Sequence, residues 1–260
     1  MNAASWIHQM PIIAVFGCTI LFVVFCKFFG MGLAARVKTP VAGEESVGSV
    51  VGATVGLLAF MLAFTFNMTA NRFDARKQLV LDEANAIETT YLRAGLLPEE
   101  FTAPARALLR EYVDLRVRAA SDRTTLDASL ARSEAIHDEL WASVEEMFSE
   151  APAPISYSLF VNSLNEMIDV HAKRVTVAVR QGIPGAIWMG LYLVAGLAMI
   201  AVGYQTGKGG QRPYLINTVL ALAFSVVILL ILDLDRSWEG AVRVDQQPLI
   251  DLQKKLGAAS

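Results

Sequence analysis

The sequence predicts an all-α membrane protein with four transmembrane helices and a further layer of helices in water. Hydrophobic residues make up 54% of the 260 residues, and the mean hydropathy of +0.45 is too high for an ordinary soluble domain. Charged residues make up 18%, which is too many for a protein built of membrane helices alone. No charge occurs from Ser46 to Asn71. A helix of about 26 residues rises about 39 Å, which exceeds the hydrocarbon core of a bilayer at about 30 Å.

Four apolar stretches divide the chain into membrane and soluble regions. Residues 1–66 hold the first two spans, residues 67–181 form the helical layer, residues 182–232 hold the last two spans, and residues 233–260 form a C-terminal tail. The predicted spans are Pro11–Met31, Ser46–Phe66, Ile183–Gly203 and Tyr214–Leu232.

Residues rich in helix formers continue the second span into the layer, so we expect one helix to run on to Leu97. Thr102 is a candidate N-cap for the next helix. The layer is then expected to contain helices at Thr102–Ser121, Thr125–Glu150 and Ile155–Gln181.

An even number of spans places both termini and the helical layer on one side of the membrane. Basic residues near the ends of membrane spans favour the cytoplasmic side. We therefore expect a multi-pass protein of the inner membrane, with both termini in the cytoplasm. The side of the layer carries Arg72, Arg76, Lys77, Lys173, Arg174, Arg180, Arg236 and Arg243, against Lys27, Arg36, Lys38, Lys208 and Arg212 on the other side.

Every fourth residue of the second span forms a row of glycines followed by large side chains. Small residues at this spacing let helices approach closely in lipid, so the glycines could pack on a neighbouring helix while the rings face lipid. Arranged by symmetry around an axis, the rings would instead form a hydrophobic constriction of the kind that gates pores. The row contains Gly48, Gly52, Gly56, Phe60, Phe64 and Met68.

Three segments resemble the bestrophin-like family of membrane proteins. They are LLAFMLAFTFNMTANRFDARKQLVLDEANAIETTYLRAGLLP, then REYVDLR, then DLDRSWEG after the last span, in which Ser237 stands where the family often has proline. The resemblance implies a distant relation to bestrophins, which are homopentameric chloride channels. It places a pore neck at Phe60 and Phe64, with Gly56 or Leu57 one turn earlier, and Gly48 and Gly52 in the outer pore or in helix packing. The calcium clasp of animal bestrophins is not evident, so we expect no metal site.

Polar residues of the layer and of the fourth span's end are the other candidate positions. Arg76, Glu83 and Asn85 are expected at contacts between helices, because a polar group in an apolar stretch must be hydrogen-bonded. Asp235 and Arg236 close the fourth span. These charges either end the span in solvent or pair with basic residues of the layer.

Catalytic and cofactor motifs do not form a credible set. Glu134-x-x-His137 has the spacing of half a di-metal site, but only one copy is present, so we expect a surface pair. The stretch Gly203–Lys208 lacks the spacing and the hydroxyl residue of a phosphate loop. A net charge of −3 indicates no nucleic-acid partner. We predict no enzymatic activity and no cofactor.

The sequence as a whole predicts an ion channel that forms a ring of identical subunits in a lipid bilayer. Small anions are the expected ions, because the edges of aromatic rings are electropositive and no carboxylate lies inside any span. The alternative is a non-conducting scaffold whose cytoplasmic layer binds a partner.

Overall fold

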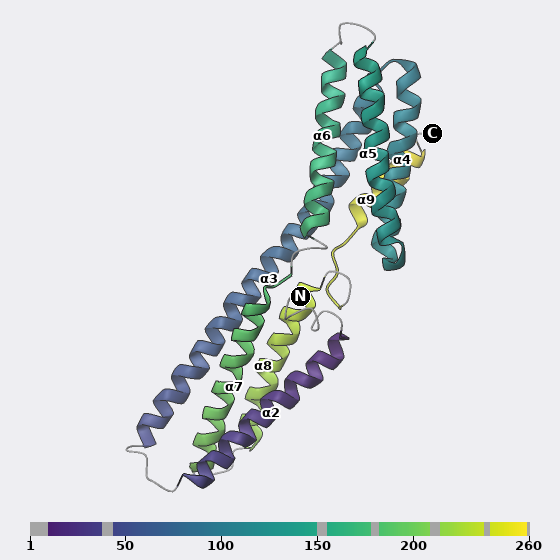
Figure 1. Ribbon diagram of the computed structural model, residues 1–260. Helices are drawn as coiled ribbons and strands as arrows, with labels where there is room; N and C mark the ends of the chain where they lie inside the picture. Colours follow the sequence, from purple (N-terminus) through teal and green to yellow (C-terminus); the bar gives the residue numbers. More distant parts are fainter. Residues whose placement is uncertain are drawn as a thin grey trace. The chain divides into compact units, whose positions relative to one another are not determined.

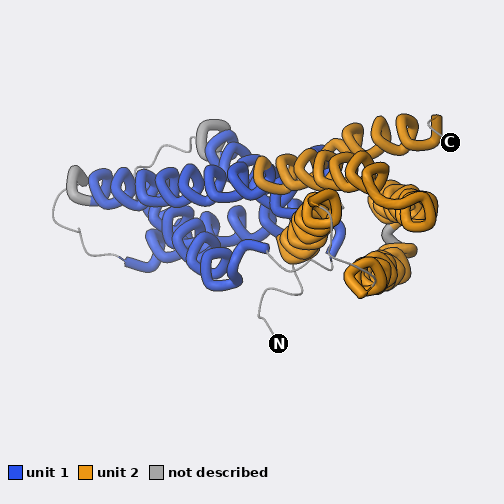
Figure 2. Tube along the Cα trace, turned by 90° about the horizontal axis from the view of Figure 1, so that it is seen from above, with its two compact units in different colours: residues 1–73, 182–243 blue, residues 74–181, 244–260 orange. Residues whose placement is uncertain are grey.

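The computed structural model describes residues 10–37, 44–149, 155–177, 182–208, 214–236 and 240–258. All regular structure within these ranges is helical. The chain divides into two compact units, one made of residues 1–73 and 182–243, the other of residues 74–181 and 244–260 (Figures 1 and 2). The long helix α3 (Glu44–Ala94) contributes to both.

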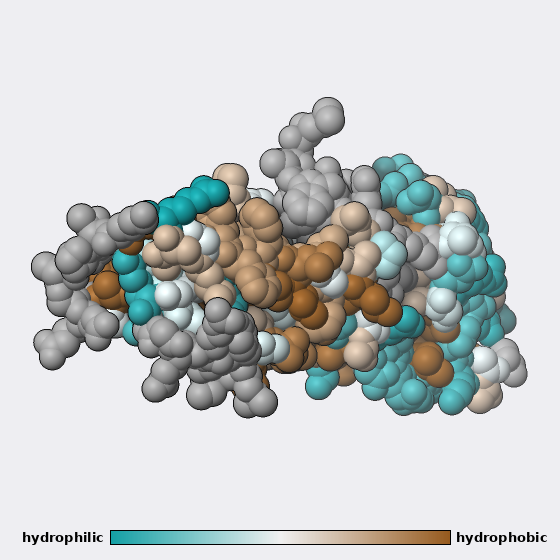
Figure 3. Space-filling model, turned by 90° about the horizontal axis from the view of Figure 1, so that it is seen from below, coloured by the Kyte–Doolittle hydropathy of each residue, from teal (hydrophilic) through white to brown (hydrophobic). Residues whose placement is uncertain are grey.

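The first unit contains the membrane spans. Besides the first part of α3 it holds α2 (Ile12–Arg36), α7 (Gly185–Lys208) and α8 (Tyr214–Asp235). All four helices are long and apolar enough to cross a membrane. Figure 3 shows one face on which hydrophobic side chains gather. Many such side chains on this unit are exposed, among them Leu21, Phe25, Leu193 and Val226, as expected of helices that contact lipid.

Helices α3, α7 and α8 share the main core of this unit. Leu58 and Leu62 of α3 are buried against Trp188 and Leu191 of α7 and Ile228 of α8. These are large apolar side chains without charge, so packing alone holds this contact.

Helices α2 and α7 are joined by a seam of small residues. A Cβ atom on Gly30 would overlap the backbone carbonyl of Ile200, and one on Gly203 would overlap the carbonyl of Lys27. The two helices carry the patterns Gly30-x-x-x-Ala34 and Gly203-x-x-x-Gly207, which bring helix backbones together in lipid. The stretch Gly203–Lys208 is thus the last part of a packed helix.

The second unit is a bundle of amphipathic helices. The last part of α3 packs with α4 (Glu99–Ser121), α5 (Leu126–Ser149), α6 (Ile155–Val175) and α9 (Gln247–Ala258), and the short 3₁₀ helix η1 (Arg123–Thr125) precedes α5. The large side chains that are fully buried at its centre are Ile87, Leu109, Tyr112, Ile136, Leu140, Phe160, Leu164, Met167 and Leu249.

One expectation about this unit is corrected. Pro98, not Thr102, is the N-cap of α4. The Thr102 hydroxyl donates instead to the carbonyl oxygens of Ala94 and Leu97, at 3.0 and 2.9 Å, where α3 ends. The expected C-terminal tail contains a helix, because Leu249, Leu252 and Leu256 repeat at helical spacing and are buried in this unit.

Several expectations fall outside the described residues. These are the expected helix ends at Glu150 and Gln181, the family position Ser237, both chain ends and the charged residues Lys38, Arg180 and Arg212.

The seam predicts a glycine-specific loss of stability. Gly30→Ala or Gly203→Ala should destabilise the protein by about 1–3 kcal/mol, because an added methyl group forces two backbones apart. Thermal unfolding in detergent measures the change. Gly32→Ala is the matched control, since nothing lies within 4 Å of its Cβ position on the same helix. Equal melting of Gly30→Ala and Gly32→Ala would contradict the seam.

Candidate functional site

The face of α3 that carries Phe60 and Phe64 is exposed in the chain. The two rings are 68% and 62% exposed, whereas Leu58 and Leu62 are 0% and 3% exposed. Residues two apart on a helix differ by about 200° in direction, so leucines in the core require phenylalanines outside it. The core contact of α3 therefore fixes the direction of both rings.

The row read every fourth residue is not one face of α3. Each step of four overshoots a full turn by about 40°, so Gly48 and Met68 end about 200° apart. Met68 packs on the core, and the Cβ position of Gly48 lies 3.5 Å from Nε2 of Gln205. The exposed part of the row is limited to Gly52, Gly56, Phe60 and Phe64, with the exposed Leu57 beside it.

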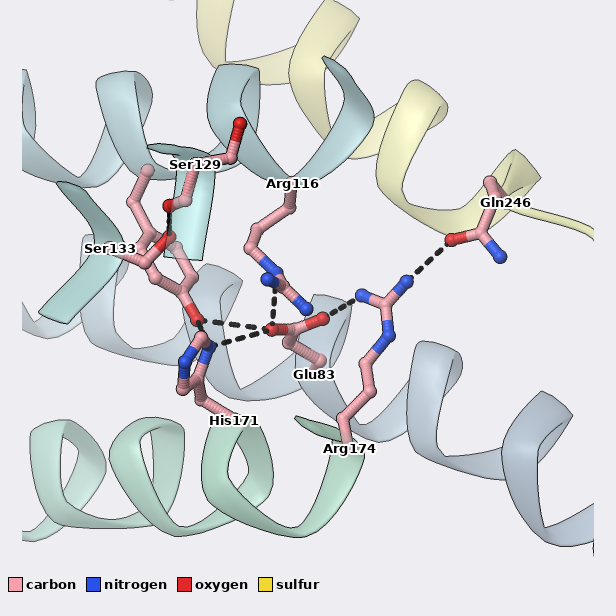
Figure 4. A network of polar contacts seen from close by, with 8 residues as sticks. Glu83, Arg116, Ser129, Ser133, His171, Arg174 and Gln246 are labelled. Carbon is pink, nitrogen blue, oxygen red and sulfur yellow. Dashed lines mark hydrogen bonds and ion pairs between the residues drawn. The ribbon is translucent and has the colours of Figure 1, made fainter. Parts of the chain in front are cut away.

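A buried charge network lies in the second unit around Glu83, whose side chain is 0% exposed (Figure 4). Arg116 of α4 approaches Oε1 of Glu83 at 2.9 Å, and Arg174 of α6 pairs with Oε2. The Tyr112 hydroxyl donates to Oε1 at 3.0 Å. Arg174 also donates to the side-chain oxygen of Gln246, just before α9, at 2.6 Å. One carboxylate thus joins three helices and the segment that leads to a fourth.

Electrostatics keep this carboxylate ionised. Burial raises the pKa of Glu83, but the charges of Arg174 and Arg116 outweigh burial and hold it well below its ordinary value. Burial and the charge of Glu83 raise the pKa of Tyr112 well above its ordinary value, so the phenol keeps its proton. Because that proton goes to Glu83, the contact of 2.8 Å between the Tyr112 oxygen and Nδ1 of His171 requires His171 to donate.

A second histidine lies against this network. His137 of α5 is 7% exposed, and its ring centroid lies 4.9 Å from that of His171 and 5.2 Å from that of Tyr112. The expected surface pair Glu134-x-x-His137 is therefore wrong for its histidine, since Glu134 is exposed and His137 is buried. Burial, together with the neighbouring His171 and Arg116, lowers the pKa of His137 to about 4.

The other candidate residues of the layer lie in different surroundings. Asn85 is exposed and does not join Glu83, because residues two apart on α3 point in nearly opposite directions. The expectation that Asn85 lies at a helix contact of this chain is therefore corrected. Arg76 is 6% exposed, so its side chain is buried.

The acidic residues at the end of α8 bind backbone groups of their own unit. Asp235 accepts from the amide of Ile183, before α7, at 3.1 Å. Asp233 accepts from the amides of Ala241 and Val242 at 2.9 and 3.0 Å. Both carboxylates are buried, and so is Arg236. A stop signal in solvent is therefore not their role.

Sequence reasoning missed the partners of Glu83. Tyr112 and Arg116 are four residues apart on α4, and His171 and Arg174 are three apart on α6. Polar pairs at these spacings share a helix face, and here that face is the apolar one. This local signal could have indicated a buried network, but not which carboxylate it surrounds.

Glu83→Ala should destabilise the protein by about 3–5 kcal/mol, because it leaves the guanidinium groups of the buried Arg116 and the partly buried Arg174 without their carboxylate. Thermal unfolding in detergent measures the loss. Glu88→Ala is the control on the same helix, because its pair with Lys255 is exposed and should contribute about 0–1 kcal/mol. If both variants melt like the wild type, the network does not stabilise the fold.

Acid should weaken the second unit through His137. Its pKa is 6.5 ordinarily and about 4 in the fold, so the unfolded chain binds the extra proton and stability is lost as the pH falls from 6.5 towards 4. Between pH 7 and pH 5 the loss should reach up to about 2 kcal/mol. Glu83 contributes only at lower pH, since its ordinary pKa is 4.5. His137→Leu should flatten the melting temperature over this interval, and an unchanged slope would contradict the assignment.

Comparisons with known proteins fit this architecture. Residues 17–249 match the bestrophin-like domain. A bacterial bestrophin homologue from Klebsiella pneumoniae, solved with a point mutation, is 15% identical, with a TM-score of 0.67 over 94% of this chain and 98% of that chain. The crystal structure of a mutated membrane protein gives 14% identity and a TM-score of 0.69 over 94% and 97%.

No curated protein matches the chain. Identities this low show a shared fold and nothing more. The match to the family covers most of the chain, and it shows that the protein belongs to the bestrophin-like family.

Proposed function

We propose that the protein is an ion channel whose pore is lined by the exposed face of α3. Copies of the chain surround an axis, and Phe60 and Phe64 of each copy form a hydrophobic neck. Gly56 and Leu57 lie one turn earlier in the path, and Gly52 and Gly48 lie towards its outer end or pack against a neighbouring helix. The ring is expected to be a pentamer, as the resemblance to bestrophins implies.

The observation that carries this proposal is the exposure of two large rings in line with open glycines on α3, the membrane helix that continues into the second unit. Nothing lies within 4 Å of the Cβ positions of Gly52 and Gly56, so this side of α3 has no partner within the described chain. Phenylalanine offers water no hydrogen bond, so a narrow ring of it dewets and closes the path. A single copy cannot enclose such a path, and assembly is required.

Small anions, chloride among them, are the proposed ions. The edges of aromatic rings are electropositive, and none of the four predicted spans contains a carboxylate. In this proposal the protein lies in the inner membrane. Both termini and the second unit face the cytoplasm, because more basic residues lie on that side.

A non-conducting scaffold is the second candidate. Leu92 and Leu96 of the second unit are 60% and 55% exposed and lie four residues apart, and paired apolar residues in water often mark a binding surface. This surface equally fits contacts between copies of the chain. Ionic current from purified protein separates the two functions.

Phe60→Ala combined with Phe64→Ala should raise the conductance of protein reconstituted in planar bilayers, because a wider neck stays wet. The control is Phe25→Ala combined with Phe29→Ala. These rings have the same spacing and are 68% and 51% exposed, but they lie on α2. Reversal potentials under a chloride gradient give the ion selectivity.

Indistinguishable currents from the two double variants, at equal protein abundance, would place Phe60 and Phe64 away from the pore. The absence of current from every preparation would favour the scaffold.

A further inference from the structure

Two exposed asparagines follow the phenylalanines on the same side of α3. Asn67 and Asn71 each lie about 20° from the direction of Phe60 around the helix axis. Asn67 begins about 4.5 Å beyond Phe64 along the helix, and Asn71 lies about 6 Å further on. Both belong to the first unit and both are exposed. Asn71 directly precedes Arg72, the first charged residue after the span.

These carboxamides differ from the other polar groups in this part of α3. The hydroxyls of Thr65 and Thr69 lie on the buried side and donate to the carbonyl oxygens of Met61 and Thr65, at 2.7 and 2.8 Å. Within the described residues, the side chains of Asn67 and Asn71 make no hydrogen bond. Their donors and acceptors are thus available to something outside the chain, such as water or an ion.

We propose that Asn67 and Asn71 form the polar step at the inner end of the phenylalanine neck, where they set ion selectivity. This inference rests on the proposed channel function. An anion that crosses a dry neck loses water ligands, and side-chain amide N–H groups can replace them. A carboxamide does so without a fixed charge. The ion is therefore held weakly enough to leave.

Asparagine-to-aspartate substitution tests the step, because it replaces an amide by a carboxylate of the same shape. Reversal potentials are measured in planar bilayers under a potassium chloride gradient for the wild type, Asn67→Asp and Asn71→Asp. Each variant should lower the ratio of chloride to potassium permeability about threefold or more, the effect of one charge about 6 Å from the ion in water. Asn165→Asp is the control, since Asn165 is an exposed asparagine on α6.

A second variant changes the same position without adding charge. Asn67→Leu extends the apolar neck by one turn and should reduce conductance several-fold while leaving selectivity unchanged. It also serves if the aspartate variants are poorly produced, because leucine is favourable in a membrane helix.

The outcomes distinguish a failure of the polar step from a failure of the proposed channel function on which it rests. If Phe60→Ala/Phe64→Ala changes the current while the Asn67 and Asn71 variants behave like Asn165→Asp, the channel stands and the polar step is wrong. If no preparation conducts, both the channel function and the polar step are overturned. If Asn67→Asp shifts the reversal potential and Asn71→Asp does not, the polar step consists of the Asn67 side chains alone, and the proposal is supported for that position.

Discussion

The unbroken backbone of α3 is the constraint on which the rest of the structure depends. A helix in lipid must form the hydrogen bonds of every peptide group internally. Helix α3 therefore continues as a helix out of the membrane until water or capping groups can bond to its last peptide groups. It ends at Ala94, whose carbonyl oxygen accepts from the Thr102 hydroxyl. Continuity fixes the direction of each side chain by its place in the sequence. Burying Leu58 and Leu62 therefore exposes Phe60 and Phe64, and burying Glu83 exposes Asn85.

The two units solve the burial of polar groups in different ways. In the membrane unit, hydroxyls bond the carbonyl one turn earlier on their own helix, as Thr65 and Ser225 do. Such bonds do not involve a neighbouring helix. The packing of α2 on α7 depends mainly on shape at Gly30 and Gly203, and one hydrogen bond of 2.8 Å joins the hydroxyls of Thr19 and Tyr192. In the second unit, the buried polar group is a carboxylate, which cannot donate to a carbonyl of its own helix as a hydroxyl does. Glu83 requires groups from α4 and α6, and this requirement fixes how those helices meet.

The sequence predicted the properties that depend on local composition. The four spans and the continuation of the second into the layer follow from hydropathy and helix formers, and the structure has four helices long and apolar enough to cross a membrane, one of which runs on into the second unit. The exposed side of α3 also follows from helical geometry. The calculation must include the rotation of about 40° at each step of four residues, which turns the row from Gly48 to Met68 around the helix. The partners of Glu83, the burial of His137 and the seam at Gly30 depend on which helices meet. No single helix carries that information.

Charge balance around Glu83 explains why the second unit should tolerate acid poorly. The guanidinium groups of Arg116 and Arg174 face one carboxylate, and the neighbouring phenol of Tyr112 cannot ionise to help, because burial and the charge of Glu83 both oppose it. Any further positive charge must therefore be excluded. His137 meets this condition by staying neutral, and Gln246 meets it by offering Arg174 an oxygen without introducing another titrating group. The single negative charge of the network, on Glu83, is thus shared by two cations. A proton taken up nearby has no acceptor left to stabilise it.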